Sequence, residues 1–301
     1  MDLVSKESIE TSDSATLGEI DFTASDDLLI HGDAESVLSR LPGSSVDLIY
    51  IDPPFNTGNK QMLSSLRAER DNNASRIGFG GRKYRTTLVS SHSYEDSFDD
   101  YLGFLLPKLE QSHRLLSDRG TLYIHLDYRE VHYVKVALDS IFGRDNFMNE
   151  IIWAYDYGGR SKQKWPAKHD TILVYAKHLG QHIFNYSQIE RIPYMAPNLV
   201  SKEKAALGKV PTDVWWQTIV HTTGKERTGY PTQKPEAILK RIIEASSQPD
   251  SWILDFFAGS GTTASVAQKM GRRFIAVEKN PQAVEIIKAR LNMDKVEVKV
   301  L

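Results

Sequence analysis

A carboxylate, two prolines and an aromatic ring follow a run of apolar residues in the segment VDLIYIDPPFNTG, residues 46–58. The run has the length of a strand buried on both faces, so Asp52 is predicted at that strand's carboxyl end. Pro53 and Pro54 fix φ and donate no N–H, which leaves rigid carbonyl acceptors. Phe55 offers a face for an aromatic base, so the segment suits an exocyclic amine that must face an electrophile. The alternative is a proline turn with Asp52 as a cap and Phe55 in the core.

A glycine-rich segment, LDFFAGSGTTA (residues 254–264), joins an apolar strand to a helix. Glycines let the backbone approach a ligand closely, and a helix N-terminus offers free N–H groups. Glu278 follows the next strand about 20 residues later, where a carboxylate can bind two ribose hydroxyls. This order predicts a nucleoside cofactor at the carboxyl ends of the strands. The alternative is a plain glycine-rich turn with Glu278 as a helix cap.

Strands and helices alternate along most of the chain, and residues 178–228 are expected to be irregular. Apolar runs predict strands at 28–33, 46–51, 121–126, 150–155, 171–175, 252–257 and 273–278. Helical spacing predicts helices near 34–41, 98–116, 129–142 and 236–246, from 262, and at 282–292. The alternation predicts an α/β fold with a doubly wound, mainly parallel sheet covered on both faces.

Charge is unevenly distributed along the chain. The formal net charge is −2, yet residues 1–36 hold ten acidic side chains against one lysine, so the remainder is basic. Residues 1–24 are predicted to be a flexible acidic leader. Residues 57–93 form a basic insertion that is longer than a plain connection, and residues 157–228 carry a second basic stretch. A basic body permits a polyanionic partner without naming one.

The composition excludes several classes of chemistry. The 301 residues include no cysteine, which rules out disulfides, Cys-ligated zinc and a thiolate nucleophile. Neither an apolar run of about 18 residues nor a secretory h-region is found, so we expect no membrane partner and a cytoplasmic location. The histidines lack ligand spacing such as H-E-x-x-H, so no metal is predicted, and His125 is interpreted with most of them as a surface or satisfied core residue.

Three motifs together resemble the amino-group DNA methyltransferases of the β group. Residues 52–55 (DPPF) match their catalytic D-P-P-Y/F motif, and residues 257–261 (FAGSG) match their F-x-G-x-G cofactor motif. The catalytic motif lies upstream, which is the order of the β group. A proline-threonine-lysine segment, YPTQKP at 230–235, precedes the cofactor strand as it does in that group. The resemblance spans about residues 26–292.

The resemblance implies a Rossmann-like methyltransferase fold with an inserted target-recognition region and S-adenosyl-L-methionine as the cofactor. Residues 25–156 would be the catalytic half, in which 57–93 form an inserted basic DNA-clamp loop. Residues 157–228 would be the target-recognition region and 229–301 the cofactor-binding half. Family members with D-P-P mostly methylate N6 of adenine, so the expected function is sequence-specific methylation of a flipped adenine in double-stranded DNA.

Site roles carry over from the family position by position. Asp52 and the carbonyl of Pro53 would hold the adenine N6 amine, Phe55 would stack on its ring, and Pro54 completes the motif. The cofactor side would consist of Asp33, Thr232, Lys234, Asp255, Phe257, Ala258, Gly259, Gly261, Thr262 and Glu278. Among these, Glu278 would bind the ribose, Asp33 would lie near the cofactor adenine, and Thr232 and Lys234 near its carboxylate. Asp33 has an alternative as a helix N-cap, and Lys234 as the start of the following helix.

DNA contacts are expected from two basic stretches. The candidates are Asn56, Lys60, Arg82, Lys83, Arg85, Arg160, Lys162, Lys164 and Lys168. Solvated, charged loops are the alternative for both stretches. A homodimer is expected because family members often pair, and a cognate restriction endonuclease could be encoded separately.

Three alternatives for the function stay open. N4-cytosine methylation would use the same scaffold. A nicotinamide-dependent dehydrogenase also satisfies the pattern G-x-G-x-x-G/A, although it leaves DPPF unexplained. A DNA-binding module could retain an inactive fold. The C5-cytosine route is excluded because it requires a cysteine nucleophile.

Overall fold

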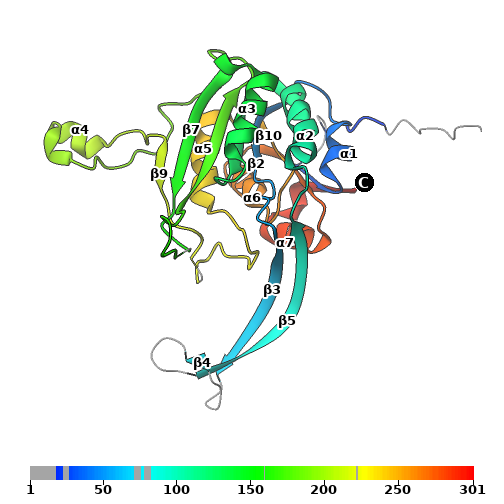
Figure 1. Cartoon of the computed structure of the whole chain (residues 1–301). Helices are drawn as coiled ribbons and strands as arrows, with labels where there is room; N and C mark the ends of the chain where they lie inside the picture. The colour runs from blue at the N-terminus through cyan, green and yellow to red at the C-terminus, as the bar shows by residue number, and fades with distance from the viewer. Residues whose placement is uncertain (1–17, 23–26, 71–75, 78–82, 159, 222) are drawn as a thin grey trace, which may run out of the picture.

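The computed structural model describes residues 18–22, 27–70, 76–77, 83–158, 160–221 and 223–301, and of the strands within 59–95 the backbone alone. Within these residues a nine-stranded sheet runs in the order β12-β1-β11-β10-β2-β6-β8-β7-β9 (Figure 1). Its strands are β1 (Asp27–His31), β2 (Val46–Ile51), β6 (Leu116–Leu126), β7 (Phe147–Ala154), β8 (His169–Ala176), β9 (Val214–Trp216), β10 (Trp252–Asp255), β11 (Arg273–Glu278) and β12 (Val296–Val300).

Neighbouring strands are parallel except where β8 pairs with β6 and with β7. The predicted mainly parallel sheet is therefore confirmed. The direction in which successive strands are added reverses between β10 and β2. The next strand after β10, β11, lies on the side away from β2, and β6 lies on the side of β2 away from β10. In open α/β sheets, ligands bind in the crevice at such a switch point, beyond the carboxyl ends of the strands. The strand order therefore predicts a ligand-binding site beyond the carboxyl ends of β2 and β10.

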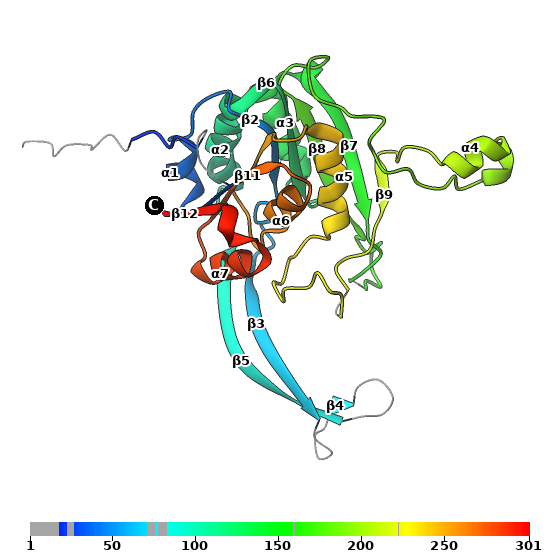
Figure 2. The same ribbon diagram turned by 180° about the vertical axis from the view of Figure 1, so that it is seen from behind.

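Helices cover both faces of the sheet, as the alternation predicted (Figures 1 and 2). One buried cluster joins the sheet to the first three helices, and a second joins it to the last three. The first set is α1 (Ala34–Leu38), α2 (Tyr101–Leu115) and α3 (Val131–Phe142). The second set is α5 (Glu236–Ser246), α6 (Thr262–Lys269) and α7 (Pro281–Arg290). Buried β2 side chains enter both clusters, which explains its continuous apolar run.

The basic insertion at 57–93 is not a loop, and that prediction was wrong. It forms a long antiparallel hairpin of β3 (Asn59–Arg70) and β5 (Lys83–Asp96), with a short β4 (Arg76–Ile77) at its far end. The hairpin extends away from the sheet (Figures 1 and 2). Its composition, rich in Asn, Ser, Gly and Arg, suggested a loop, because the pairing between the two strands cannot be recognised in either strand alone. Arg82 lies outside the described residues.

Three further elements were not predicted. β12 pairs in parallel with β1 at the sheet edge, and its side chains are exposed or partly exposed, so no buried apolar run marks it. Within 178–228, β9 pairs with β7, and the short helix α4 (Lys202–Leu207) lies on an arm beyond it (Figure 2). In the described ranges, no helix is long and apolar enough to cross a membrane.

Candidate active site

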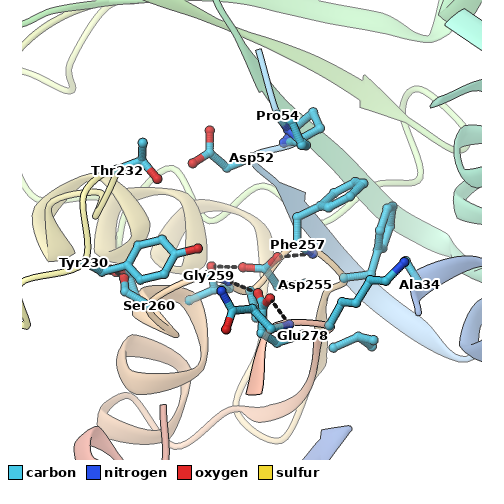
Figure 3. A pocket seen from close by; sticks show the side chains of 18 of the residues that line it. Ala34, Asp52, Pro54, Tyr230, Thr232, Asp255, Phe257, Gly259, Ser260 and Glu278 are labelled. Atoms are coloured by element: carbon cyan, nitrogen blue, oxygen red, sulfur yellow. Dashed lines mark hydrogen bonds between the residues drawn. The ribbon is translucent and has the colours of Figure 1, made fainter. Parts of the chain in front are cut away.

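The catalytic and glycine-rich motifs open into one cavity. β2 and β10 are parallel neighbours with Leu254 beside Ile49, so the residues that follow them reach the same edge. A cavity of about 620 Å³ there is lined by Asp52 and Phe55 from one motif and by Gly259 from the other. Figure 3 shows Asp52 and Pro54 on one side of this space and Gly259, Ser260 and Glu278 on the other. The two motifs, about 200 residues apart, therefore form one site.

The glycine turn is held in a conformation that favours glycine. Gly259 has φ of 52° and Gly261 has φ of 70°. A Cβ atom on Gly261 would lie 2.8 Å from Cγ1 of Ile287 on α7, so the close packing of α7 requires glycine there. Gly261 is also the N-cap of α6. Unlike the other predicted cofactor residues, Gly261 does not line the cavity, because it faces α7.

Gly261→Ala is expected to destabilise the protein by about 1–3 kcal/mol, because the new methyl group overpacks against Ile287 at a positive φ. Gly271→Ala is the matched control. Gly271 has φ of 66° with no atom within 4 Å of its Cβ position, so an alanine there adds the backbone strain without a steric clash. Urea unfolding of both variants measures the difference. Equal losses would show that contact with α7 does not constrain the turn.

Glu278 ties the turn to the end of β11. Its Oε2 accepts a hydrogen bond from the Gly259 N–H at 2.7 Å, and its Oε1 accepts one from the Asn280 N–H at 2.8 Å. Burial raises the pKa of Glu278, while these backbone donors oppose the shift. Each carboxylate oxygen has a second lone pair, so the side chain can still accept from ribose hydroxyls. Asn280 is the N-cap of α7, so the helix-cap alternative for Glu278 was wrong, and ribose binding by Glu278 stays a prediction.

Asp255 is the last residue of β10, and its side chain stabilises the same glycine turn through two hydrogen bonds. Its two carboxylate oxygens accept hydrogen bonds from the Phe257 N–H at 3.0 Å and from the Thr263 hydroxyl at 2.6 Å. This turn ends β10 at Asp255, two residues before the predicted end. Burial, with the negative charges of Asp52 and Glu278 nearby, raises the pKa of Asp255 to about 7.

We expect Asp255 to make the protein less stable as pH rises from about 4 to about 7. In that window the folded state holds a proton that the unfolded chain has released, so the proton-linked stability present at low pH is lost. Between pH 5 and pH 8 the loss should be about 2–3 kcal/mol. Asp255→Asn keeps the shape and removes the titration. Urea unfolding at both pH values should show a smaller decrease for the variant; equal decreases would contradict the assignment.

Asp52 has one occupied and one free oxygen. Its Oδ2 forms an ion pair with Nζ of Lys234, which is buried. Its Oδ1 has no hydrogen-bond partner in the part of the chain that the structure describes, and lies 4.0 Å from Nδ1 of His125. The Lys234 ammonium also lies 5.1 Å from the centroid of the Phe55 ring. The Asp52 carboxylate is thus held at one oxygen by Lys234, while its other oxygen is buried beside His125 without a hydrogen-bond partner among the described residues.

The remaining predicted cofactor residues line the cavity as well. They are Asp33, Thr232, Lys234, Phe257, Ala258 and Thr262. Asp33 is also the N-cap of α1 and accepts from the Glu35 N–H at 3.0 Å, so the N-cap alternative is confirmed, while its place near the cofactor adenine stays a prediction. Lys234 forms an ion pair with Asp52, a contact that the sequence did not indicate.

Aromatic residues that the sequence analysis missed complete the wall. Phe104 of α2 lies 6.0 Å, centroid to centroid, from Phe257 and stacks on Phe98 at 4.5 Å. Tyr230 lies beside the glycine turn, with its Cε1 3.3 Å from the Cβ position of Gly259 (Figure 3). The signal was the spacing of Phe98, Tyr101 and Phe104, which places three rings on one side of a helix start.

The predicted DNA contacts lie in three settings. Lys60, Lys83 and Arg85 belong to the β3–β5 hairpin. Arg160, Lys162 and Lys164 are exposed in the loop after β7, while Lys168 is half-buried. Asn56 is engaged within the protein: its Nδ2 donates to Glu130 at 2.8 Å and its Oδ1 accepts from the Phe98 N–H at 3.0 Å. A DNA contact by Asn56 stays a prediction.

Comparison with known proteins identifies the family. The N6/N4 methyltransferase family model, described as DNA methylase, matches residues 46–289. This chain belongs to that family. The methylase is 32% identical to the type II methyltransferase M.HpaI of Haemophilus parainfluenzae, over 89% of this chain and 75% of the relative. It is 31% identical to the DNA adenine methyltransferase YhdJ of Escherichia coli, over 88% of this chain and 82% of the relative.

Solved structures share the fold of this methylase. The cytosine-N4-specific PvuII DNA methyltransferase aligns with a TM-score of 0.62 at 15% identity, over 89% of this chain and 87% of that chain. The M1.HpyAVI–SAM complex aligns with a TM-score of 0.56 at 20% identity, over 88% of this chain and 99% of that chain. The predicted family, fold class and enzyme class are confirmed, and family membership excludes the dehydrogenase alternative.

Proposed function

We propose that this methylase transfers a methyl group from S-adenosylmethionine to N6 of adenine in double-stranded DNA. The observation that carries the proposal is the shared cavity, which Asp52 and Phe55 line together with the glycine turn and Glu278. An amine held by Asp52 and a donor bound at the turn would therefore meet. The D-P-P motif favours adenine, and the name of one relative, YhdJ, specifies adenine.

The residues present fit this cofactor. Glu278 offers a buried carboxylate beside the turn for the ribose. Phe104 and Phe257 supply apolar rings for the flat parts of the ligand, and about 620 Å³ is within the usual size of cofactor sites. When bound, S-adenosylmethionine supplies a methyl group on a positively charged sulfur.

Positioning of the amine is the main task of the catalytic motif. The lone pair of N6 is delocalised into the purine ring, so the free amine is a poor nucleophile. The Asp52 carboxylate would accept one amine hydrogen and the Pro53 carbonyl would accept the other, which favours a tetrahedral nitrogen. Asp52 can also receive the proton that the nitrogen releases. Phe55 would stack on the extruded base.

Sequence-specific recognition is proposed for the parts that surround this edge of the sheet. β7 ends and β8 begins at the edge where β2 ends, so the loop between them flanks the cavity mouth. That loop presents exposed Arg160, Lys162 and Lys164 together with Trp165, which is 95% exposed. Cations there suit phosphates, and they suit guanine equally. We propose residues 157–228 as the recognition region and the β3–β5 hairpin as a DNA clamp.

One experiment tests the function directly. Unmethylated plasmid is incubated with the purified protein and S-adenosylmethionine, digested to nucleosides and analysed by mass spectrometry. N6-methyladenine is the expected product. N4-methylcytosine would establish the alternative substrate, and neither product would overturn the proposal. Sequencing of the product would reveal the recognised site. A homodimer, a separately encoded endonuclease and a cytoplasmic location stay predictions, of which light scattering tests the first.

A further inference from the structure

A buried hydrogen-bonded chain lies directly behind Asp52. Nδ1 of His125 is 3.0 Å from the Tyr50 hydroxyl, and its Nε2 is 3.2 Å from Oδ2 of Asp170. Oδ1 of Asp170 accepts in turn from the Tyr155 hydroxyl at 3.1 Å. The His125 side chain is fully buried. The chain therefore crosses β2, β6 and β8 beneath the cavity instead of serving a surface role.

The sheet register brings His125 to the catalytic motif. β2 and β6 are parallel with Ile51 beside Ile124, so Asp52 and His125 are the next residues on neighbouring strands. Nδ1 of His125 lies 4.0 Å from Oδ1 of Asp52, which is too far for a hydrogen bond. The imidazole centroid lies 5.7 Å from that of the Phe55 ring. His125 therefore adjoins both the acceptor and the stacking ring.

Asp170 holds the buried imidazole from one side. Burial alone would raise the pKa of Asp170, but the hydrogen bond and charge of His125, with Lys234 and Tyr155, hold it below its ordinary value. Asp170 is therefore ionised and accepts a hydrogen bond from Nε2–H of His125. Burial, together with the charge of Asp52, raises the pKa of Tyr50, so its hydroxyl stays protonated beside Nδ1 of His125.

We propose that His125, oriented by Asp170, is a positioning residue for methyl transfer. Its ring, held between Tyr50 and Asp170, lies beside the buried Oδ1 of Asp52 and so fixes how the carboxylate is turned toward the cavity. Its ring also supports Phe55 from behind. The inference rests on the proposed role of Asp52 and adds residues outside the DPPF motif to the site.

Single-turnover methylation of DNA by the purified full chain tests the inference. His125→Ala is expected to lower the rate constant about 100-fold, the scale of a misplaced reacting group, with cofactor and DNA affinities within about threefold. If His125→Ala does not fold, Asp170→Asn is the second variant, and its rate constant should also fall.

Tyr123→Phe is the matched control. Tyr123 lies two residues before His125, hence on the same face of β6, and its hydroxyl bonds Ser246 in the core at 2.8 Å. It should lower the unfolding midpoint without changing the rate more than about threefold. A His125→Ala rate within threefold of wild type would overturn the inference. If both His125→Ala and Asp52→Ala keep the wild-type rate, the proposed function itself is wrong. If His125→Ala keeps the rate and Asp52→Ala is inactive, only the proposed role of His125 is wrong.

Discussion

Asp52→Ala is expected to lower the rate of methyl transfer by about 1,000-fold or more, because it removes the acceptor that orients the amine. The cavity wall around Glu278 and the glycine turn does not depend on this carboxylate, so cofactor affinity by calorimetry should stay within about threefold. The variant also leaves the Lys234 ammonium buried without its partner, so some loss of stability is expected. Single-turnover rates, measured below the unfolding midpoint, separate the two effects.

Asp47→Ala is the matched control for Asp52→Ala. Asp47 lies near the amino end of the same strand, β2, and its carboxylate accepts from the Ser117 hydroxyl at 2.8 Å, away from the cavity. The control variant should transfer methyl groups at close to the wild-type rate. Retained turnover in Asp52→Ala would refute the catalytic assignment of the DPPF motif.

Glu278→Ala is expected to weaken cofactor binding by about 100-fold or more, because hydrogen bonds to a buried charged group contribute about 1.5–3 kcal/mol each. The variant also frees the Gly259 N–H, which loosens the turn that faces the ligand. Glu278→Gln should also bind S-adenosylmethionine weakly. The NH₂ group of the glutamine amide would face the N–H of Gly259 or of Asn280, and two donors cannot form a hydrogen bond with each other. Calorimetric titration with S-adenosylmethionine measures both variants.

Glu285→Ala provides the comparison for Glu278→Ala. Glu285 lies on α7, its side chain is 71% exposed, and its carboxylate pairs with Lys288 outside the cavity. Cofactor affinity should be unchanged in this variant, because exposed ion pairs contribute little. Equal affinities for wild type, Glu285→Ala and Glu278→Ala would place the cofactor elsewhere.

The sequence predicted the parts of the molecule that local patterns encode. The apolar run before Asp52, the glycine turn before α6 and the acid after β11 are each set by residues within a few positions of one another. Such patterns follow from side-chain periodicity and from the backbone freedom of glycine, so neither needs knowledge of distant contacts. The mainly parallel sheet followed from the alternation of strands and helices.

The sequence analysis missed elements that are defined by pairing between separate segments, namely the β3–β5 hairpin and β9. The β3–β5 hairpin is too polar to suggest strands, and its two strands are recognised only through their register with each other. β9 is three residues long and exists by pairing with β7. His125 was interpreted as a surface or core residue because nothing local relates it to Asp52.

What the sequence by itself determined is the set of groups available for chemistry: an acceptor beside an aromatic ring, and a glycine turn followed by an acidic residue at the end of the next strand. What only the tertiary structure decided is which of these groups meet. Asp52 follows β2, His125 lies on β6 and Lys234 precedes α5, and the strand order and register bring them together. Strand order depends on how whole apolar faces pack, a property of many distant residues at once that no short segment carries.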